Sequence, residues 1–326
     1  MSRMPSGPAR SGPRDPSSLP PLPHGRTARR MDWLLLPPAV RRLVEARVGP
    51  VVAAESAGAG FTPGLASVLT GADGRRTFLK AASRKAQRPF ADAYALEARR
   101  LRDLPRSLPV PRLLWSHADD LWVVLALEHL DGANPDRPWR EDQLASCLDT
   151  LEELADALTP PPMRLRSLAD ELAGQAACWD HVRATAPGWP HLEEAAQLAS
   201  RFAGATQGGT LVHTDVRDDN LLLDGHGRAW LCDWNFPVVG AAWVDTVCLL
   251  MTAAGDGVDT DALLAERRLT RDVPADDVDA VLALLCGFFL RQRDSPVPHS
   301  SPYLRRHQDW CAEASWAWLA RRRGWA

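Results

Sequence analysis

The sequence predicts a two-lobed α+β fold: a small N-terminal antiparallel sheet with one helix, followed by a larger, mainly helical C-terminal lobe. Residues 57–130 hold short apolar runs bounded by glycine turns and a single helical stretch, which is the pattern of a small sheet. Residues 143–322 instead hold six stretches of helical spacing, interrupted by one β-rich island at 221–234. We therefore expect an N-terminal lobe over 32–130 and a C-terminal lobe over 131–326.

The first 31 residues form a tail of different composition. They carry six Arg and one Asp among repeated Pro, Ser and Gly, and they lack apolar spacing, so we expect residues 1–31 to be disordered. The tail has no apolar region of the kind found in secretory signals. It is either a basic arm for an acidic partner or, as we favour, a dispensable start, with Met31 as an alternative first residue.

Composition argues against several classes of function. The net charge of −3 gives no argument for binding nucleic acid or a membrane surface, and no run approaches the length of a membrane span. The six cysteines are scattered without a CxxC pair, so we expect neither a metal cluster nor a disulfide framework. A reducing cytoplasm fits this cysteine usage best. The oligomeric state is left open.

The N-terminal lobe is expected to begin with an amphipathic helix over residues 32–48, followed by a glycine-rich loop at 56–64. A GADG turn then joins two apolar runs as a β-hairpin. The runs that predict strands in this lobe are 65–69, 77–82, 110–117 and 120–130.

One helix is expected between the second and third of these strands, over residues 90–104. Tyr94, Glu97 and Leu101 share one of its faces, because positions three and four apart are neighbours on a helix. Glu97 also lies one turn from Arg100, so a surface pair between these two is the alternative to a buried role for Glu97.

The C-terminal lobe carries one β-hairpin among its helices. The helical stretches are 143–158, 167–183, 191–204, 242–254, 276–291 and 303–322. The island at 221–234, LLLDGHGRAWLCDW, has the turn and the apolar runs of a hairpin. The octet HTDVRDDN at 213–220 precedes it and Asp233 lies at its far end, so both acidic clusters flank a single hairpin.

Clustered carboxylates repel one another, and a divalent metal ion that carries a nucleotide would supply the positive charge they need. Phosphoryl transfer requires a base near the acceptor hydroxyl, oxygen ligands for Mg²⁺ and positive charge over the phosphates. Asp215 is the candidate base. Asn220 and Asp233 are the candidate metal ligands, because Mg²⁺ takes one or two such oxygens together with phosphate oxygens.

The order H-x-D-x-x-x-x-N, hairpin, Asp-aromatic resembles the catalytic core of protein-kinase-like enzymes. His213, Asp215 and Asn220 match the catalytic loop, with His213 as scaffold, and Asp233 of DWN matches the metal-binding Asp of the DFG element. Only twelve positions separate Asp233 from Asp245, which leaves no room for the activation segment of protein kinases. The chain is therefore similar to the aminoglycoside phosphotransferase and choline kinase-like family.

This resemblance implies roles for residues of the N-terminal lobe. Lys80 would hold the nucleotide phosphates, and Glu97 would be its ion-pair partner. Gly58 and Gly60 take the place of the glycine-rich phosphate cover, although the third glycine, Gly64, comes one position late.

The resemblance also implies a hinge, a brace and a phosphate contact. Residues 128–130 would be the hinge, where the backbone near Glu128 and Leu130 meets the adenine. Asp245 would brace the catalytic loop, and Arg217 would contact the transferred phosphate. The implied cofactors are ATP, with GTP not excluded, and Mg²⁺.

Two other acidic groups have simpler explanations. We expect Asp218 and Asp219 to be solvated turn residues outside the site. Residues 254–279 hold eight acidic and three basic side chains, which we interpret as a solvated face. A surface for a cationic acceptor is the alternative interpretation of this stretch.

The leading hypothesis is an ATP-dependent phosphotransferase that acts on a hydroxyl of a small molecule, such as an aminoglycoside, a macrolide, an amino alcohol or a sugar. The alternative is a nucleotide-binding regulatory module without turnover. A protein kinase is disfavoured by the short gap after Asp233, and a P-loop nucleotidase by the absence of GxxxxGK[ST]. The sequence does not name the acceptor.

Overall fold

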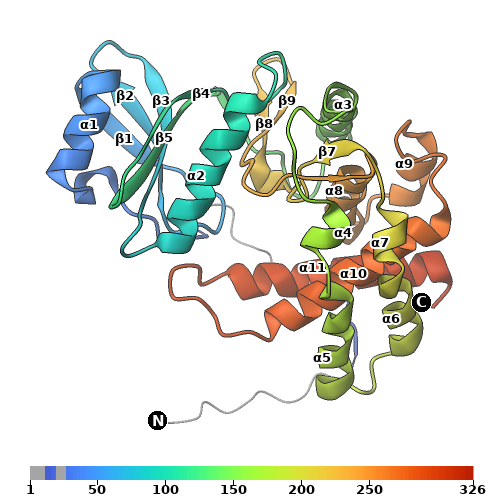
Figure 1. Ribbon diagram of the computed structural model, residues 1–326. Coiled ribbons are helices and arrows are strands. Elements are labelled where there is room, and N and C mark those ends of the chain that lie inside the picture. The colour runs from blue at the N-terminus through green and yellow to red at the C-terminus, as the bar shows by residue number, and fades with distance from the viewer. Residues whose placement is uncertain (1–11, 20–26, 326) are drawn as a thin grey trace, which may run out of the picture.

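The structure, a computed structural model, describes residues 12–19 and 27–325. An antiparallel sheet forms the N-terminal part and helices form most of the C-terminal part (Figure 1), so the predicted α+β class is confirmed. The position of the boundary between two lobes, at residue 130, stays a prediction. Within the described ranges, no helix is long and apolar enough to cross a lipid bilayer.

Five antiparallel strands build the N-terminal sheet in the order β1-β2-β3-β5-β4. Their bounds are β1 Val51–Ser56, β2 Leu65–Gly71, β3 Arg76–Ser83, β4 Leu113–Ala118 and β5 Trp122–Glu128. Strands β2 to β5 lie where the four apolar runs predict them. Strand β1 escapes prediction because it lies at the edge of the sheet and its sequence, VVAAES, lacks a clear alternation of apolar and polar residues.

Two helices pack on opposite faces of this sheet. Helix α1 (Pro38–Val48) packs on one set of alternating strand residues: Leu65, Leu69, Leu79, Ala81, Val124 and Ala126. Helix α2 (Arg88–Asp103) packs on the other set: Ala82, Val123 and Leu125. Because successive side chains of a strand point to opposite faces, Lys80, which lies between Leu79 and Ala81, faces α2.

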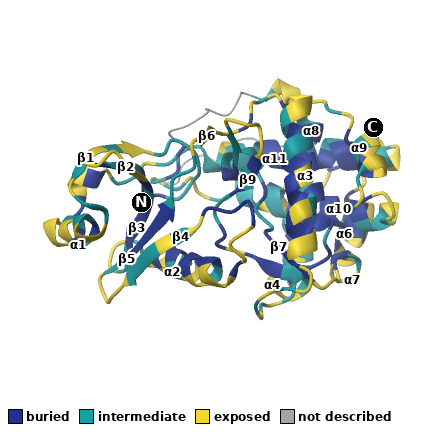
Figure 2. Ribbon diagram, turned by 90° about the horizontal axis from the view of Figure 1, so that it is seen from above, coloured by how far each residue is buried: buried dark blue, intermediate teal, exposed yellow. Residues whose placement is uncertain are grey.

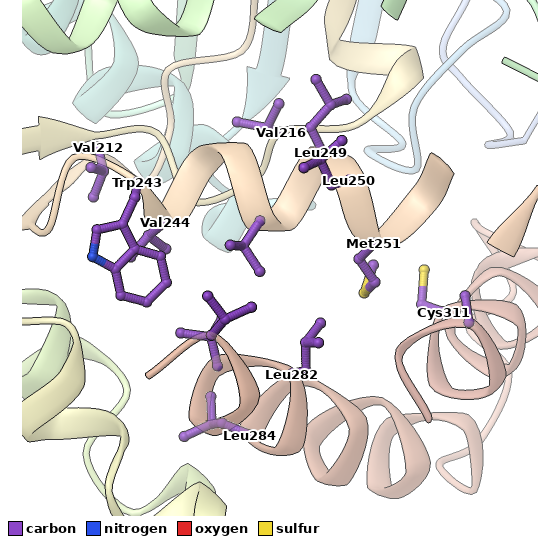
Figure 3. Close-up of a cluster of buried hydrophobic side chains, with 14 of the residues drawn as sticks. Val212, Val216, Trp243, Val244, Leu249, Leu250, Met251, Leu282, Leu284 and Cys311 are labelled. Atoms are coloured by element: carbon purple, nitrogen blue, oxygen red, sulfur yellow. The ribbon is translucent and has the colours of Figure 1, made fainter. Parts of the chain in front are cut away.

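The C-terminal part is built around three helices that pack against one another, α8, α10 and α11. The helix bounds are α3 Glu141–Ala157, α4 Leu168–Glu171, α5 Cys178–Thr185, α6 Leu192–Ser200, α7 Phe202–Ala205, α8 Val244–Gly255, α9 Thr260–Glu266, α10 Ala275–Arg293 and α11 Leu304–Arg323. Helix α8 is apolar on nearly all sides and is correspondingly buried (Figure 2). Figure 3 shows Met251 of α8 pointing toward Leu282 of α10 and Cys311 of α11.

Two predicted helices are broken in the structure. The stretch 167–183 is divided between α4 and α5, because Gly174 has a φ of +83°, in the left-handed region. The stretch 191–204 is divided at Arg201, whose N–H bonds to the carbonyl of Leu198. Helix α9 is an additional short helix within the acidic stretch, capped by the side chain of Asp259.

Two small antiparallel sheets fix the position of the two acidic segments, and one of these sheets contains the predicted hairpin. Strands β8 (Leu221–Asp224) and β9 (Ala229–Leu231) form that hairpin, and β6 (Gly132–Ala133) pairs with β8. Strand β7 (Thr210–Val212) ends directly before the octet, and it pairs with β10 (Val238–Gly240), which begins just after Asp233-Trp234-Asn235. The two acidic segments therefore run side by side between the two ladders.

The N-terminal segment, residues 12–19, is held against helix α11, contrary to the disorder expected for residues 1–31. The guanidinium of Arg14 donates to Asp309 at 2.6 Å, and its backbone N–H donates to the carboxylate of Glu313 at 2.7 Å. The amino-acid composition does not predict this attachment. The segment is held by polar bonds and ion pairs to the carboxylates of α11, and not by the burial of apolar side chains.

Residues 27–31 are also attached to the rest of the chain. The hydroxyl of Thr27 donates to the carbonyl of Gly60 at 2.5 Å, and Met31 packs against the core beneath α1. The remainder of the predicted tail, residues 1–11 and 20–26, lies outside the described residues.

Candidate functional site

Lys80 holds two carboxylates at once. Its ammonium donates to Glu97 at 2.7 and 2.9 Å and to Oδ1 of Asp233 at 2.7 Å. Strand β3 points Lys80 at α2, where Glu97 is fully buried, and Asp233 follows β9. Glu97 therefore pairs with Lys80, and its burial rules out the alternative surface pair with Arg100.

Opposite charges keep Lys80 and Asp233 ionised, whereas burial raises the pKa of Glu97 to about 7 although the Lys80 ammonium opposes that rise. Burial lowers the pKa of Lys80, but the neighbouring Asp233 and Glu97 carboxylates outweigh it, and the net pKa is raised. Burial raises the pKa of Asp233, but the Lys80 ammonium outweighs it, and the net pKa is lowered. The pair is charged at neutral pH, which places a fixed positive charge beside the end of the hairpin.

Helix α8 fixes the start of the catalytic loop through one carboxylate. Asp245, in its first turn, accepts the backbone N–H of His213 at 2.7 Å and that of Thr214 at 2.8 Å. The His213 ring lies 2.9 Å, through Nε2, from the carbonyl of Cys232, and its Nδ1 accepts the N–H of Asp215 at 3.2 Å. Burial lowers the pKa of His213, so the ring is neutral and both of its nitrogens are occupied.

Two residues of the site have an unusual backbone conformation. Thr214 has a φ of 65° and Asp233 a φ of 67°, both in the left-handed region that non-glycine residues seldom adopt. The Thr214 hydroxyl donates to the carbonyl of Phe236 at 3.1 Å, and the amide of Asn235 donates to Asp233. Such conformations persist only where the surroundings enforce them, and they cluster at functional sites.

Both carboxylate oxygens of Asp215 accept hydrogen bonds. Arg217 donates to one oxygen, and the amide nitrogen of Asn220 donates to the other at 3.0 Å and to the Asp215 carbonyl at 2.8 Å. Burial raises the pKa of Asp215 to about 6, although the Arg217 guanidinium opposes that rise. This carboxylate has the proton affinity of a base that works near neutral pH.

The hairpin places Asn220 opposite Cys232, the residue directly before Asp233. The N–H of Cys232 donates to the carbonyl of Asn220 at 2.8 Å, which extends the β8–β9 ladder by one step. The octet and the DWN segment therefore meet at one end of the hairpin, with Lys80 on the Asp233 side.

The family comparison matches this arrangement. The model of the phosphotransferase enzyme family matches residues 64–276, more than half of the chain, and the matched range contains Lys80, Asp215 and Asp233. The chain belongs to the phosphotransferase enzyme family. This confirms the resemblance drawn from the catalytic motifs. No curated protein matches the sequence.

Solved structures of phosphotransferases share the fold. An aminoglycoside phosphotransferase from Alicyclobacillus acidocaldarius is 16% identical, with a TM-score of 0.53 over 89% of this chain and 96% of that chain. The choline kinase LicA from Streptococcus pneumoniae is 12% identical, with a TM-score of 0.56 over 85% and 99%. The amicoumacin kinase hAmiN, solved with AMP-PNP, Ca²⁺ and Ami, is 12% identical, with a TM-score of 0.52 over 85% and 93%. These likenesses confirm the predicted kinase-like fold.

In this phosphotransferase the residues at the end of the hairpin fit a magnesium ion shared with phosphates. Asn220 uses its amide nitrogen for both bonds to Asp215, which leaves its carbonyl oxygen for a cation. A further oxygen, Oδ1 of Asn235, is buried without a hydrogen-bond partner beside Asp233. The described ranges hold no cluster of three His, Cys, Asp or Glu side chains that could bind a metal. A cation here therefore needs phosphate oxygens as further ligands.

The glycine loop is tied to distant parts of the phosphotransferase chain. The carbonyl of Gly58 accepts the N–H of Thr27 at 3.3 Å, and that of Phe61 accepts the hydroxyl of Ser301 at 2.5 Å. Gly60 has a φ of +82°, where a side chain would be strained. The phosphate role of Gly58 and Gly60 stays a prediction, and both lie before the range that the family model matches.

The predicted hinge lies at the end of strand β5. The N–H of Glu128 donates to the carbonyl of Arg112 at 2.9 Å, and its carboxylate accepts Nε of the same arginine at 2.7 Å. Glu128 lies three residues beyond Leu125, the register partner of Lys80. Leu130 is half-buried two residues further on. The adenine contact of this segment stays a prediction.

Asp218 and Asp219 are ion-paired, and the expectation that they are solvated turn residues is wrong. Asp219 accepts Nε of Arg217 at 2.8 Å, and Asp218 accepts Nη1 of Arg137 at 3.0 Å. Sequence reasoning misses Arg137, because it lies 81 residues from Asp218 and no local pattern marks it.

Proposed function

We propose that the protein transfers the γ-phosphate of ATP to a hydroxyl of a small molecule. The observation that carries this proposal is the convergence at one end of a hairpin: Lys80 contacts Asp233, while Asp215 and Asn220 bond to each other one ladder step away. Membership of the phosphotransferase family and the AMP-PNP complex of the similar amicoumacin kinase support it. The six unpaired cysteines support a cytoplasmic location.

Asp215 acts as the base in this proposal. It takes the proton of the acceptor hydroxyl as the new oxygen–phosphorus bond forms and the bond to the ADP leaving group breaks. Its pKa of about 6 leaves it ionised at neutral pH and still able to accept a proton. Asn220 holds the carboxylate in place through its amide nitrogen.

The cations of the site act on the phosphates. Lys80 is held by Glu97 in position to contact them, and Arg217 moves from Asp215 toward the transferred phosphate while Asp219 retains its other edge. Mg²⁺ bound by Asp233 and Asn220 would neutralise charge on the phosphate oxygens. Gly58, Gly60 and the backbone near Glu128 and Leu130 complete the nucleotide site.

One observation favours a second candidate, a nucleotide-binding regulatory module without turnover. Arg217 is paired with Asp215, and a base held permanently in that ion pair could not accept a proton. Such a module would bind Mg·ATP and form no phosphorylated product.

The substitution Asp215→Asn tests the proposal. With Mg·ATP and panels of aminoglycosides, macrolides and amino alcohols, mass spectrometry should detect a phosphorylated product with the unmodified protein. We expect the variant to lose about 10²–10⁴ in rate, because it lacks the base, while its affinity for Mg·ATP changes little.

Asp120→Asn is the matched control, because Asp120 is exposed in the β4–β5 turn, and it should retain the full rate. Full turnover by Asp215→Asn would remove Asp215 as the base. Nucleotide binding without any product across the panels would favour the regulatory module.

A further inference from the structure

Arg30 contacts the glycine loop from a segment that precedes the range matched by the family model. Its Nη2 donates to the carbonyl of Ala59, and a Cβ added at Gly60 would lie 2.9 Å from the same nitrogen. Thr27, three residues earlier, holds the loop as well, because its hydroxyl donates to the carbonyl of Gly60. The guanidinium of Arg30 therefore lies against the backbone of the loop.

The glycine loop also lies beside both cations of the proposed nucleotide site. Phe61, which follows the part of the loop that Arg30 contacts, has its ring centroid 5.8 Å from the guanidinium of Arg217. At the end of the loop, the last glycine lies against the hydroxyl of Tyr94, whose ring centroid is 5.6 Å from the Lys80 ammonium. The loop therefore runs past the catalytic loop and past Lys80.

Tyr94 relates Arg30 to Lys80. Burial raises the pKa of the Tyr94 hydroxyl to about 12, although the charges of Lys80 and Arg30 both oppose that rise. Two cations from distant parts of the sequence therefore act on a single buried hydroxyl. This places the charge of Arg30 in the neighbourhood of Lys80.

Arg30 differs from the other two cations of this region in its partners. Lys80 and Arg217 each bond to two carboxylates. Among the residues that the structure describes, Arg30 bonds to one backbone carbonyl and to no carboxylate, and its Nε is buried without a hydrogen-bond partner. Leaving a buried donor of a charged group unpaired is unfavourable, so an anion at Arg30 would be stabilised.

A phosphate group suits the donors that remain on Arg30. A guanidinium holds five N–H donors in a planar fork, which matches the oxygens of a phosphate. The carbonyl of Ala59 uses one of these donors. The side chain can therefore keep its bond to the glycine loop and bind phosphate oxygens at the same time.

We infer that Arg30 is a further binding residue of the nucleotide site, an inference that rests on the proposed function. Its guanidinium binds the phosphate chain of the nucleotide and holds the glycine loop through Ala59. The N-terminal segment thus adds a cation to a site whose other cations come from β3 and the catalytic loop.

Calorimetry with Mg·ATP on variants of the full chain tests this inference. Arg30→Gln keeps a donor for the Ala59 carbonyl but removes the charge, and it should bind Mg·ATP at least about ten-fold more weakly. Arg30→Lys keeps the charge and should bind more tightly than Arg30→Gln. Arg29→Gln is the matched control: Arg29 is exposed and contacts His299, so its affinity should not change.

Two further measurements separate phosphate binding from a purely structural role in the loop. Thr27→Val removes a bond to the loop without changing charge, and it should weaken Mg·ATP by less than about three-fold. Urea unfolding without nucleotide should be the same for Arg30→Gln and the unmodified protein, while Mg·ATP should stabilise the variant less.

Three outcomes would overturn the inference. Arg30→Gln could bind Mg·ATP as tightly as the unmodified protein, Arg30→Gln and Arg30→Lys could lose the same affinity, or Thr27→Val could lose as much as Arg30→Gln. The last two results would make Arg30 a structural residue of the loop.

Product analysis separates this inference from the proposed function. Binding of Mg·ATP that depends on Arg30, without a phosphorylated product in any panel, would support the inference and count against transfer. Product formation by Arg30→Gln with an unchanged KM for ATP would support transfer and reject the inference. No binding of Mg·ATP by the unmodified protein would overturn both.

Discussion

The region around Lys80, called the nucleotide end below, and the cavity beside the catalytic loop, which residues 134–138 and helix α11 line, each contain a cation between two carboxylates. The two groups differ in what they leave available to a ligand. Lys80 joins Glu97 to Asp233 through a single ammonium, a compact charge that can also meet phosphate oxygens. Arg137 joins Asp218 to Asp256 through its planar fork, so that two carboxylates share one positive charge. The first arrangement keeps a point charge that a ligand can also contact, and the second fixes two carboxylates of different segments in one geometry.

The sequence supports this contrast. Lys80 and Lys85 are the only two lysines in the chain, and the other basic side chains are arginine. Lysine therefore occurs at the buried position where a point charge is needed, in a protein that otherwise uses arginine for its ion pairs.

The largest effect should come from breaking the nucleotide end with Lys80→Met. This variant leaves Glu97 buried without its cation, and removing one partner of a buried pair costs about 3–5 kcal/mol. We expect a loss of that size in the free energy of unfolding and weaker binding of Mg·ATP, measured by urea titration and calorimetry.

Lys85→Met is the matched control, since Lys85 is exposed five residues away, and neither quantity should change. If Lys80→Met bound Mg·ATP as tightly as the unmodified protein, Lys80 would have no place in the nucleotide site.

A smaller effect should follow from Arg14→Ala, which weakens one wall of the cavity. Glu313 keeps its bond to Arg293 at 3.0 Å and its bond to the Arg14 N–H, so we expect a stability loss of only about 1 kcal/mol. The KM for the acceptor should rise several-fold, while the KM for ATP stays constant. Arg75→Ala, at an exposed surface pair, should alter neither constant. An equal rise in the KM for the acceptor and the KM for ATP would contradict the prediction that Arg14 affects the cavity and not the nucleotide end.

The smallest effect concerns His307, which lies between the cavity and Arg217. Burial lowers the pKa of His307 to about 3, well below the ordinary value of 6.5. Below pH 6.5 the unfolded chain therefore takes up a proton that the folded chain does not, and His307 costs stability as the pH falls from 6.5 toward 3.

His307→Gln should remove this cost, which is at most about 1.4 kcal/mol per pH unit. Urea unfolding at pH 7.5 and pH 5 should show a smaller loss on acidification for the variant than for the unmodified protein. Parallel losses in the two proteins would mean that His307 is protonated in the folded state.

The same contrast explains how much could be predicted from the sequence. The elements around Lys80 and the octet are short-range patterns: strands, one helix and a hairpin with residues at fixed spacings. The structure brings Lys80, Glu97 and Asp233 together as the family resemblance implies.

The cavity could not be predicted in this way. Arg137 meets Asp256 across 119 residues, and Arg14 meets Glu313 across 299. No periodicity or spacing relates such positions, and their pairing depends on how the helices pack. For the same reason the expectation that residues 254–279 form a solvated face is only partly correct, since four of their acids accept hydrogen bonds from arginines of other elements: Asp256, Asp261, Asp276 and Asp279.

The left-handed conformations of Thr214 and Asp233 have a consequence for how the protein should respond to heat. Each such residue stores about 1–3 kcal/mol, and at Thr214 the restraint comes from Asp245 and thus from the seating of α8 in the core. If warming weakens the packing of the first turn of α8, the hydrogen bonds of Asp245 to the loop are lost. Thr214 can then return to a common backbone conformation while most of the helices remain folded. Catalytic competence should therefore fade several degrees before the cooperative loss of helical circular dichroism.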